Sequence, residues 1–126
     1  MALENTHYGA ANIAAMLREC KSIFFIGIGG INMSSLAHMT HTRSFCVGGS
    51  DRVRSALVER LVNEGIEIFE GHAADNINGY DAVVYTVAVG ADNPEYCEAK
   101  RRGIPCISRS DYMGYLMTDY RVRVGI

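Results

Sequence analysis

A glycine-rich turn between an apolar strand and a helix constrains this chain more than any other feature of its sequence. In the stretch IFFIGIGGINMSSLA, residues 23–37, four apolar residues lead into Gly27, Gly29 and Gly30 and then into a helical pattern. The glycines permit tight turning, and the start of a helix leaves backbone N–H groups without partners. We interpret the turn as a site for an anion, with a plain strand-to-helix turn as the alternative.

The rest of the chain alternates short apolar segments with amphipathic ones. The apolar segments that we expect to be strands are 23–27, 44–48, 66–69, 82–89, 104–108 and 120–126. The expected helices are about 10–19, 31–42, 53–65, 94–102 and a short one from Ser108 or Ser110 through Met117. This alternation predicts a single α/β domain with a Rossmann-like, doubly wound parallel sheet of about five strands.

Residues 93–103 carry the residue types that begin and end a helix. Asn93 can cap the first turn, Pro94 suits the first helical position, and Glu95 places a carboxylate near the positive end of the helix dipole. Gly103 can adopt the left-handed conformation that closes the far end. We therefore expect a well-defined helix here, after the fourth strand.

Composition excludes several kinds of partner. The chain of 126 residues is 48% apolar and 21% charged, as in an ordinary globular domain, and it has no apolar run long enough for a membrane span. Its N-terminal residues lack the basic start and apolar core of a secretory signal. The net charge is −2 and the basic residues are scattered, so nucleic acid is not an expected partner. We expect a cytoplasmic protein.

The metal-ligating residue types are not spaced as metal sites. The chain has four cysteines without C-x-x-C pairing: Cys20, Cys46, Cys97 and Cys106. Two of them fall in expected strands, and we interpret all four as reduced core thiols. His38 and His41, on the expected helix 31–42, have no cysteine or carboxylate at ligand spacing, so we interpret them as surface residues.

Polar residues follow the other expected strands. Asp51 lies 22 positions after Gly29, where an acid can accept hydrogen bonds from ribose hydroxyls. It can equally cap the helix expected near residue 53. Ser50 is free to take that capping role instead. His72 is typical of a solvated loop residue. The hydroxyl of Thr86 can meet a ligand or bond a backbone carbonyl.

The sequence offers no set of catalytic groups. Asn32 occupies the third glycine position of G-x-G-x-x-G, so either the following helix stands off slightly or the Asn32 side chain reaches the ligand. No nucleophile, base and acid can be grouped, and the chain has no G-x-x-x-x-G-K-[ST] loop for ATP. We therefore expect no catalytic residue and no metal ligand in this chain.

Four segments together resemble one family. FIGIGGINMSSLA, VGGSD, GIEIFEGH and DNPEYCEAKRRGIPCISRSDYMGYLM stand in the order and at the separations found in the N-terminal domain of the Mur ligases. The resemblance covers about residues 23–126 and is nearest to the member that joins L-alanine to UDP-N-acetylmuramic acid. It implies a Rossmann-like domain, residues 21–126, that binds the UDP part of this sugar nucleotide, preceded by an N-terminal helical extension, residues 1–20.

The resemblance also implies roles for individual residues. It implies a diphosphate loop after the first strand, contacts beside the nucleotide after the second, a histidine in the uridine pocket, and crevice-lining residues after the fourth. These residues are Gly27, Gly29, Gly30, Ile31, Asn32, Met33, Ser50, Asp51, His72, Thr86, Val87 and Ala88. His72 thus becomes an expected ligand contact. The family usually has glycine at Asn32 and at Ser44, and the first of these departures affects the diphosphate loop.

The family reaction needs more than this sequence contains. The resemblance implies that a full-length enzyme uses ATP and Mg²⁺ to activate the muramic acid carboxylate before the amine of L-alanine attacks it. Central ATP-binding and C-terminal domains are absent here, so we expect an excised first domain that is not itself catalytic. Two alternatives stay open: an NAD(P)-binding domain of a dehydrogenase, and a non-catalytic sensing module, for which Asn32 is the best support.

Overall fold

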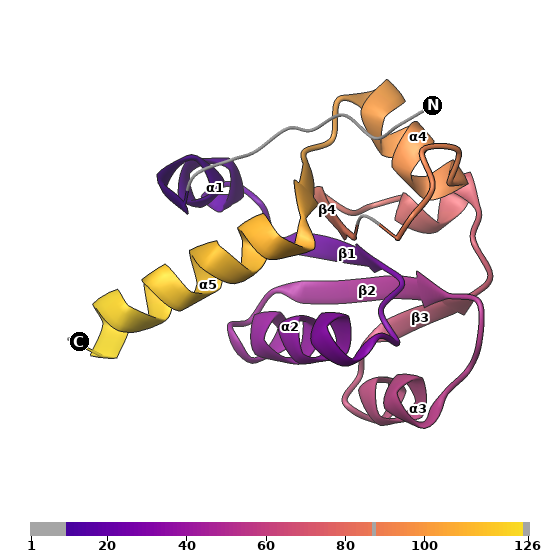
Figure 1. The fold of residues 1–126 in the computed structure, drawn as a ribbon, viewed down its shortest axis with the longest axis horizontal. Coiled ribbons are helices and arrows are strands. Elements are labelled where there is room, and N and C mark those ends of the chain that lie inside the picture. Colours follow the sequence, from indigo (N-terminus) through magenta and orange to yellow (C-terminus); the bar gives the residue numbers. More distant parts are fainter. Residues whose placement is uncertain (1–9, 87, 125–126) are drawn as a thin grey trace.

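The structure, a computed structural model, describes residues 10–86 and 88–124 and contains a five-stranded parallel sheet in the order β3-β2-β1-β4-β5 (Figure 1). Its strands are β1 (Ser22–Ile26), β2 (Cys46–Asp51), β3 (Glu67–Glu70), β4 (Ala82–Tyr85) and β5 (Cys106–Ser108). Its helices are α1 (Ala10–Leu17), α2 (Ile31–Thr42), α3 (Ala56–Asn63), the 3-10 helix η1 (Ala74–Ile77), α4 (Pro94–Arg102) and α5 (Arg109–Val124). The predicted α/β fold is confirmed.

Strand β1 forms the centre of the molecule, and all five of its residues are buried. Successive side chains of a strand point to opposite faces, so Ile23 and Phe25 enter one core cluster while Phe24 and Ile26 enter the other. The first cluster includes buried residues of α1, α2, α3 and α5, and the second includes residues of η1 and α4. Both faces of the sheet are therefore covered, which explains the unbroken apolar character of β1.

The N-terminal helix α1 packs against α5, as Figure 1 shows at the end of the sheet away from α4. Ile13 and Leu17 of α1 are buried in the same core cluster as Tyr112 and Leu116 of α5. Within residues 10–86 and 88–124, no helix combines the length and the apolar character that a bilayer crossing would require.

The sixth strand expected at residues 120–126 is wrong. The described part of that segment continues α5 as far as Val124, and the helix extends beyond the sheet in Figure 1. Tyr112 and Leu116 anchor the first turns of α5 in the core. No glycine or proline follows Gly114 before residue 125, so nothing local ends the helix after Met117. Edge strand β5 is only three residues long, which offers little backbone for a sixth strand to pair with.

The signals at the ends of α4 act as predicted. The Asn93 side chain accepts hydrogen bonds from the backbone N–H groups of Glu95 and Tyr96, Pro94 occupies the first turn, and Gly103 ends the helix at φ = 74°. Asn93 satisfies two amides that the helix cannot satisfy itself, and glycine carries the left-handed conformation without steric cost. This helix fixes the position of Glu95, which matters for the site described below.

The interpretation of all four cysteines as core thiols is correct for only part of the set. All four are free, but Cys46 and Cys97 are exposed and Cys20 is half-buried, so only Cys106 is a buried core thiol. Cys46 is the first residue of β2, and the burial of this strand begins only at Val47. Among the described residues, no group of three potential ligands is arranged to hold a metal ion.

Candidate functional site

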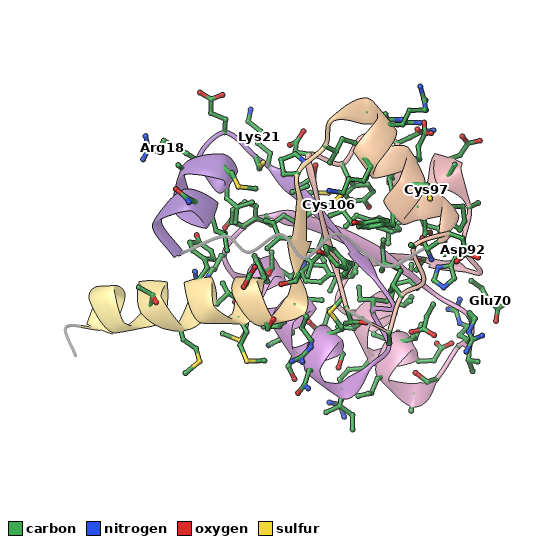
Figure 2. The ribbon with its side chains drawn as sticks, turned by 45° about the horizontal axis from the view of Figure 1, so that its top comes forward. Arg18, Lys21, Glu70, Asp92, Cys97 and Cys106 are labelled. Carbon is green, nitrogen blue, oxygen red and sulfur yellow. The ribbon has the colours of Figure 1, made fainter. Side chains whose placement is uncertain are left out.

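The candidate loops meet at the carboxyl edge of the sheet. The order β3-β2-β1-β4-β5 means that the chain winds outward from β1 in one direction and then in the other, so the order reverses between β1 and β4. Ligands of open parallel sheets bind at such a reversal, outside the carboxyl ends of the strands. In Figure 2, Glu70 at the end of β3 and Asp92 in the loop after β4 lie at the same end of the molecule.

The backbone of the glycine loop after β1 is held by the end of β2. The N–H groups of Gly27 and Ile28 both donate to the carbonyl oxygen of Ser50, at 2.8 and 3.0 Å, and the N–H of Gly30 donates to the carbonyl of Gly27 at 3.2 Å. Gly27 has φ = 77°, which favours glycine. The amides of the loop itself are thus used inside the protein, and they do not form an open cradle.

The open donors belong to the first turn of α2. Gly30 is the N-cap of this helix, and no described side chain caps it; the first turn contains no acidic residue. The first N–H groups of a helix have no intrahelical acceptor, and the positive end of the dipole lies here. Ile31 is 77% exposed and Asn32 is exposed, whereas the Met33 side chain is buried. Met33 can therefore contact a ligand only through its backbone.

Asp51 is bound to the glycine loop. Its Oδ2 accepts a hydrogen bond from the Gly29 N–H at 2.8 Å, and its Oδ1 lies 3.3 Å from the N–H of Val53. A Cβ on residue 29 would lie 2.7 Å from Asp51 Oδ2. The capping role considered for Asp51 or Ser50 is wrong: α3 starts at Ala56, and its N-cap is Ser55, which accepts from the Val58 N–H.

Ser50 and His72 meet at a buried carboxylate that the sequence did not identify as part of a site. The Ser50 hydroxyl donates to Oε1 of Glu95 at 2.7 Å, and Nδ1 of His72 lies 2.8 Å from the same oxygen and 3.0 Å from Ser50 Oγ. Asn76 donates through Nδ2 to Glu95 Oε2 at 2.7 Å. We call Glu95, Ser50, His72 and Asn76 the carboxylate cluster.

The carboxylate cluster could not be read from local sequence. Glu95 was assigned only to the first turn of its helix, and Asn76 was not singled out at all. Their partners lie 45, 23 and 19 positions apart along the chain, and only the fold brings them together. The available signal is an acid directly after Asn93 and Pro94, in the first turn of the helix that follows a buried strand.

The residues after β4 are only partly placed. The strand ends at Tyr85 and not at residue 89 as expected, so Thr86 and Ala88 lie in the loop beyond it. Thr86 is half-buried and its carbonyl accepts from the Val89 N–H at 3.0 Å, while Ala88 is exposed. Val87, which the sequence also placed in the crevice, lies outside the described residues.

Two hollows are lined by described residues of the chain. One, of about 580 Å³, is lined by Gly90, Ala91, Asp92 and Cys97. Figure 2 labels two of these residues, Asp92 in the loop after β4 and Cys97 on α4. The other, of about 440 Å³, runs between α2 and α3 and includes His38, whose Nδ1 lies 2.6 Å from Glu64 Oε1. His38 is exposed, as the sequence indicated.

Comparison with known proteins places the chain in a family. The family model described as "Mur ligase family, catalytic domain" matches residues 22–121, which is most of the chain. This chain belongs to the Mur ligase family. Its five-stranded sheet and the glycine loop after β1 lie inside the matched region.

The sequences of individual Mur ligases also match this chain. The chain is 40% identical over 110 residues to a UDP-N-acetylmuramate–L-alanine ligase of Clostridium tetani, covering 87% of this chain and 24% of the relative. It is 47% identical over 105 residues to the enzyme of the same name from Lachnoclostridium phytofermentans, covering 82% of this chain and 22% of the relative. The chain therefore spans about a quarter of the length of these relatives.

Solved structures agree at the level of the fold. A UDP-N-acetylmuramate–alanine ligase from Thermotoga maritima superposes with a TM-score of 0.72 at 38% identity, over 75% of this chain and 22% of that one. A short-chain dehydrogenase from Veillonella parvula in complex with NADP superposes with a TM-score of 0.54 at 15% identity. The second likeness extends to the fold alone, so it gives the dehydrogenase alternative little support.

Proposed function

We propose that this chain is the substrate-holding first domain of a UDP-N-acetylmuramate:L-alanine ligase and binds the UDP part of UDP-N-acetylmuramic acid. The observation that carries the proposal is the N-terminus of α2, which no described side chain caps and which lies where the strand order reverses. A diphosphate placed there receives hydrogen bonds from first-turn amides and a favourable interaction with the helix dipole. The identity to alanine-adding relatives supports the choice of substrate.

Each candidate residue then has a role that fits its place. The amides of Ile31, Asn32 and Met33 hold the diphosphate, while Gly27, Gly29 and Gly30 give the loop its shape. Ser50 and Asp51 fix that loop from β2, and His72 meets the uridine. Thr86 and Ala88 line the crevice from the loop after β4, and the family resemblance gives Val87 the same role. None of these residues transfers a proton or a phosphoryl group.

Amide bond formation is assigned to a longer parent protein. We propose that residues 1–20 are a helical extension and residues 21–126 the domain that anchors the nucleotide, with central and C-terminal domains supplying the reaction in the cytoplasm. Anchoring UDP holds the distant muramic acid carboxylate in place, and binding energy remote from a reacting group can lower its barrier in this way.

The residues of this chain do not fit ATP and Mg²⁺ themselves. The sequence has no G-x-x-x-x-G-K-[ST] loop, and the described residues include no cluster of three potential metal ligands. In the proposed parent ligase, ATP would supply the activation of the muramic acid carboxylate.

Ligand-dependent thermal stability tests the proposal. A ligand that binds only the folded state raises the melting temperature in a concentration-dependent way. UDP and UDP-N-acetylmuramic acid are expected to raise the melting temperature of the chain, and NAD and NADP at the same concentrations are expected not to. Stabilisation by NAD or NADP alone would favour the dehydrogenase alternative and reject the proposal.

A matched pair of variants locates the diphosphate. Ile31→Asp adds a negative charge to the first turn of α2 at a side chain that is 77% exposed, and Met117→Asp adds the same charge on α5 at a side chain that is 55% exposed. We expect Ile31→Asp to weaken UDP binding by about tenfold or more, because the new carboxylate competes for the helix dipole. Calorimetric titration should show no such loss for Met117→Asp. Equal affinities for both variants would place the diphosphate elsewhere.

The sensing-module alternative makes a different prediction about Asn32. If the chain had kept the fold and lost the ligand, wild-type protein would bind no UDP, and Asn32→Gly would restore binding. We expect the wild-type chain to bind UDP already, with a modest change in affinity on Asn32→Gly, because Asn32 is exposed and displaces no core packing.

A further inference from the structure

Glu95 is the most enclosed charged side chain near the crevice. Its side chain is 0% exposed, and that of His72 is 21% exposed. Glu95 lies in the first turn of α4, where the helix dipole favours a carboxylate. Burying a carboxyl group without partners is costly, so its hydrogen bonds decide how its neighbours must be arranged.

The donors around Glu95 can be counted. Its Oε1 accepts from the Ser50 hydroxyl at 2.7 Å and contacts His72 Nδ1 at 2.8 Å, and its Oε2 accepts from Asn76 Nδ2 at 2.7 Å. An ionised carboxylate only accepts hydrogen bonds. With an ionised carboxylate at Glu95, the 2.8 Å contact requires a proton on Nδ1 of His72, and this N–H donates a hydrogen bond to Oε1.

We infer that Glu95 is a positioning residue that holds the His72 ring with its proton on Nδ1, so that the neutral ring offers Nε2 to the ligand as an acceptor. Nδ1 faces the buried carboxylate, so Nε2 is the ring nitrogen left for a ligand, and the His72 side chain keeps 21% of its surface exposed. The matching ligand group is a hydrogen-bond donor on the nucleoside, either the imide N–H of a pyrimidine base or a sugar hydroxyl. This inference rests on the proposed function.

The substitution Glu95→Gln should move the proton of the neutral His72 ring from Nδ1 to Nε2. Asn76 Nδ2 needs an acceptor, so the amide oxygen of Gln takes the place of Oε2 and the amide N–H₂ faces Ser50 and His72. Nδ1 then faces an N–H donor in place of an acceptor, which favours the neutral ring with its proton on Nε2. The ring would present a donor where the ligand also has a donor, while its shape and position stay the same.

The matched control is Glu98→Gln, the same change one turn later on α4. Glu98 accepts hydrogen bonds from Arg101 and Arg102 and does not belong to the carboxylate cluster. The two variants and the wild-type chain are compared by long-range proton–nitrogen NMR of the histidine rings, at a pH where His72 is neutral, and by titration with UDP. Backbone spectra show whether each variant keeps the fold.

The NMR outcome stands without any ligand. The wild-type chain and Glu98→Gln are expected to show His72 with its proton on Nδ1, and Glu95→Gln with its proton on Nε2. A neutral His72 ring with its proton on Nε2 in the wild-type chain would overturn the inference. This result does not depend on whether any variant folds. An unchanged tautomer in a folded Glu95→Gln variant would overturn it as well.

Binding completes the test. Glu95→Gln should bind UDP about tenfold more weakly than Glu98→Gln, the loss expected from one mismatched hydrogen bond. For the wild-type chain, UDP analogues methylated at N3 or lacking the 2′- or 3′-hydroxyl identify the donor, because one of them should lose affinity by a similar factor. That loss should vanish in Glu95→Gln. Equal affinities for UDP and all of its analogues, in the wild-type chain and in both variants, would refute the ligand role of Nε2. No UDP binding by the wild-type chain and by Glu98→Gln would reject the proposed function instead.

Discussion

The carboxylate of Asp51 accepts a hydrogen bond from the backbone N–H of Gly29, with 2.8 Å between Oδ2 and the nitrogen. The two residues are 22 positions apart: Asp51 is the last residue of β2, and Gly29 lies in the loop after the neighbouring strand β1. The bond gives the glycine loop a fixed shape before any ligand arrives. Asp51, which the sequence suggests for a ribose contact or a helix cap, therefore contacts the glycine loop directly.

Removing the Asp51 carboxylate should loosen the glycine loop. We expect Asp51→Ala to lower the free energy of unfolding by about 1–3 kcal/mol, because the amide of Gly29 loses a charged acceptor. Asp51→Asn keeps an acceptor oxygen and should cost less. Urea denaturation followed by circular dichroism measures both variants. If neither substitution lowers the free energy of unfolding, the hydrogen bond to Gly29 contributes nothing to stability.

A side chain at residue 29 should disturb the same contact. In Gly29→Ala the new Cβ would lie 2.7 Å from Asp51 Oδ2 and 2.9 Å from Val58 Cγ2, closer than packed atoms allow. We expect a loss of about 1–3 kcal/mol in the free energy of unfolding. Gly114→Ala is the control, because a Cβ at that helical position meets nothing within 4 Å. It should stabilise the protein by up to about 1 kcal/mol; destabilisation by both variants would argue against the steric explanation.

Tyr112 should make the protein sensitive to alkaline pH. Burial raises the pKa of Tyr112 to about 12, with the Thr40 hydroxyl 2.5 Å from its phenol oxygen. A pKa raised on folding means that the contribution to stability is complete below the unfolded value near 10 and is lost as pH rises toward 12. Chemical denaturation between these pH values should show a falling free energy of unfolding.

The substitution Tyr112→Phe separates this effect from other titrating groups. Thr40 still donates to the Leu36 carbonyl at 2.8 Å, so the variant should lose only about 1 kcal/mol at neutral pH. Its stability should fall less steeply with rising pH than that of the wild type. Parallel curves for the two proteins would show that the pKa of Tyr112 is the same in the folded and unfolded states.

The cysteines should differ in their rate of alkylation. Cys46 and Cys97 are exposed, whereas Cys106 is buried and desolvation raises its pKa to about 11. The thiolate is the reactive form, so iodoacetamide at neutral pH should label Cys46 and Cys97 well before Cys106. Mass spectrometry of digested protein gives the order, and unfolding in urea should remove the difference. Early labelling of folded protein at Cys106 would contradict its place in the core.

Local signals in the sequence were sufficient for most of the elements, but not for the C-terminal helix or the end of β4. The apolar run at 23–26 followed by glycines gave the first strand, loop and helix, and Asn93, Pro94 and Gly103 gave the ends of α4. The residues that would contact the ligand directly were proposed from the same signals and from family resemblance, and they stay predictions. The structure adds that the loop amides are already bonded and that the open donors belong to α2.

Contacts between distant residues were decided only by the tertiary structure. Capping residues act on amides two or three positions away, so the sequence shows both partners at once. Glu95 instead meets Ser50 and His72, 45 and 23 positions away, and Asp51 meets Gly29 across the two central strands. In the same way residues 120–124 continue a helix anchored by Tyr112 and Leu116, although their apolar alternation favours a strand. Local preference is weak compared with the packing that surrounds a segment, and that packing exists only once the chain has folded.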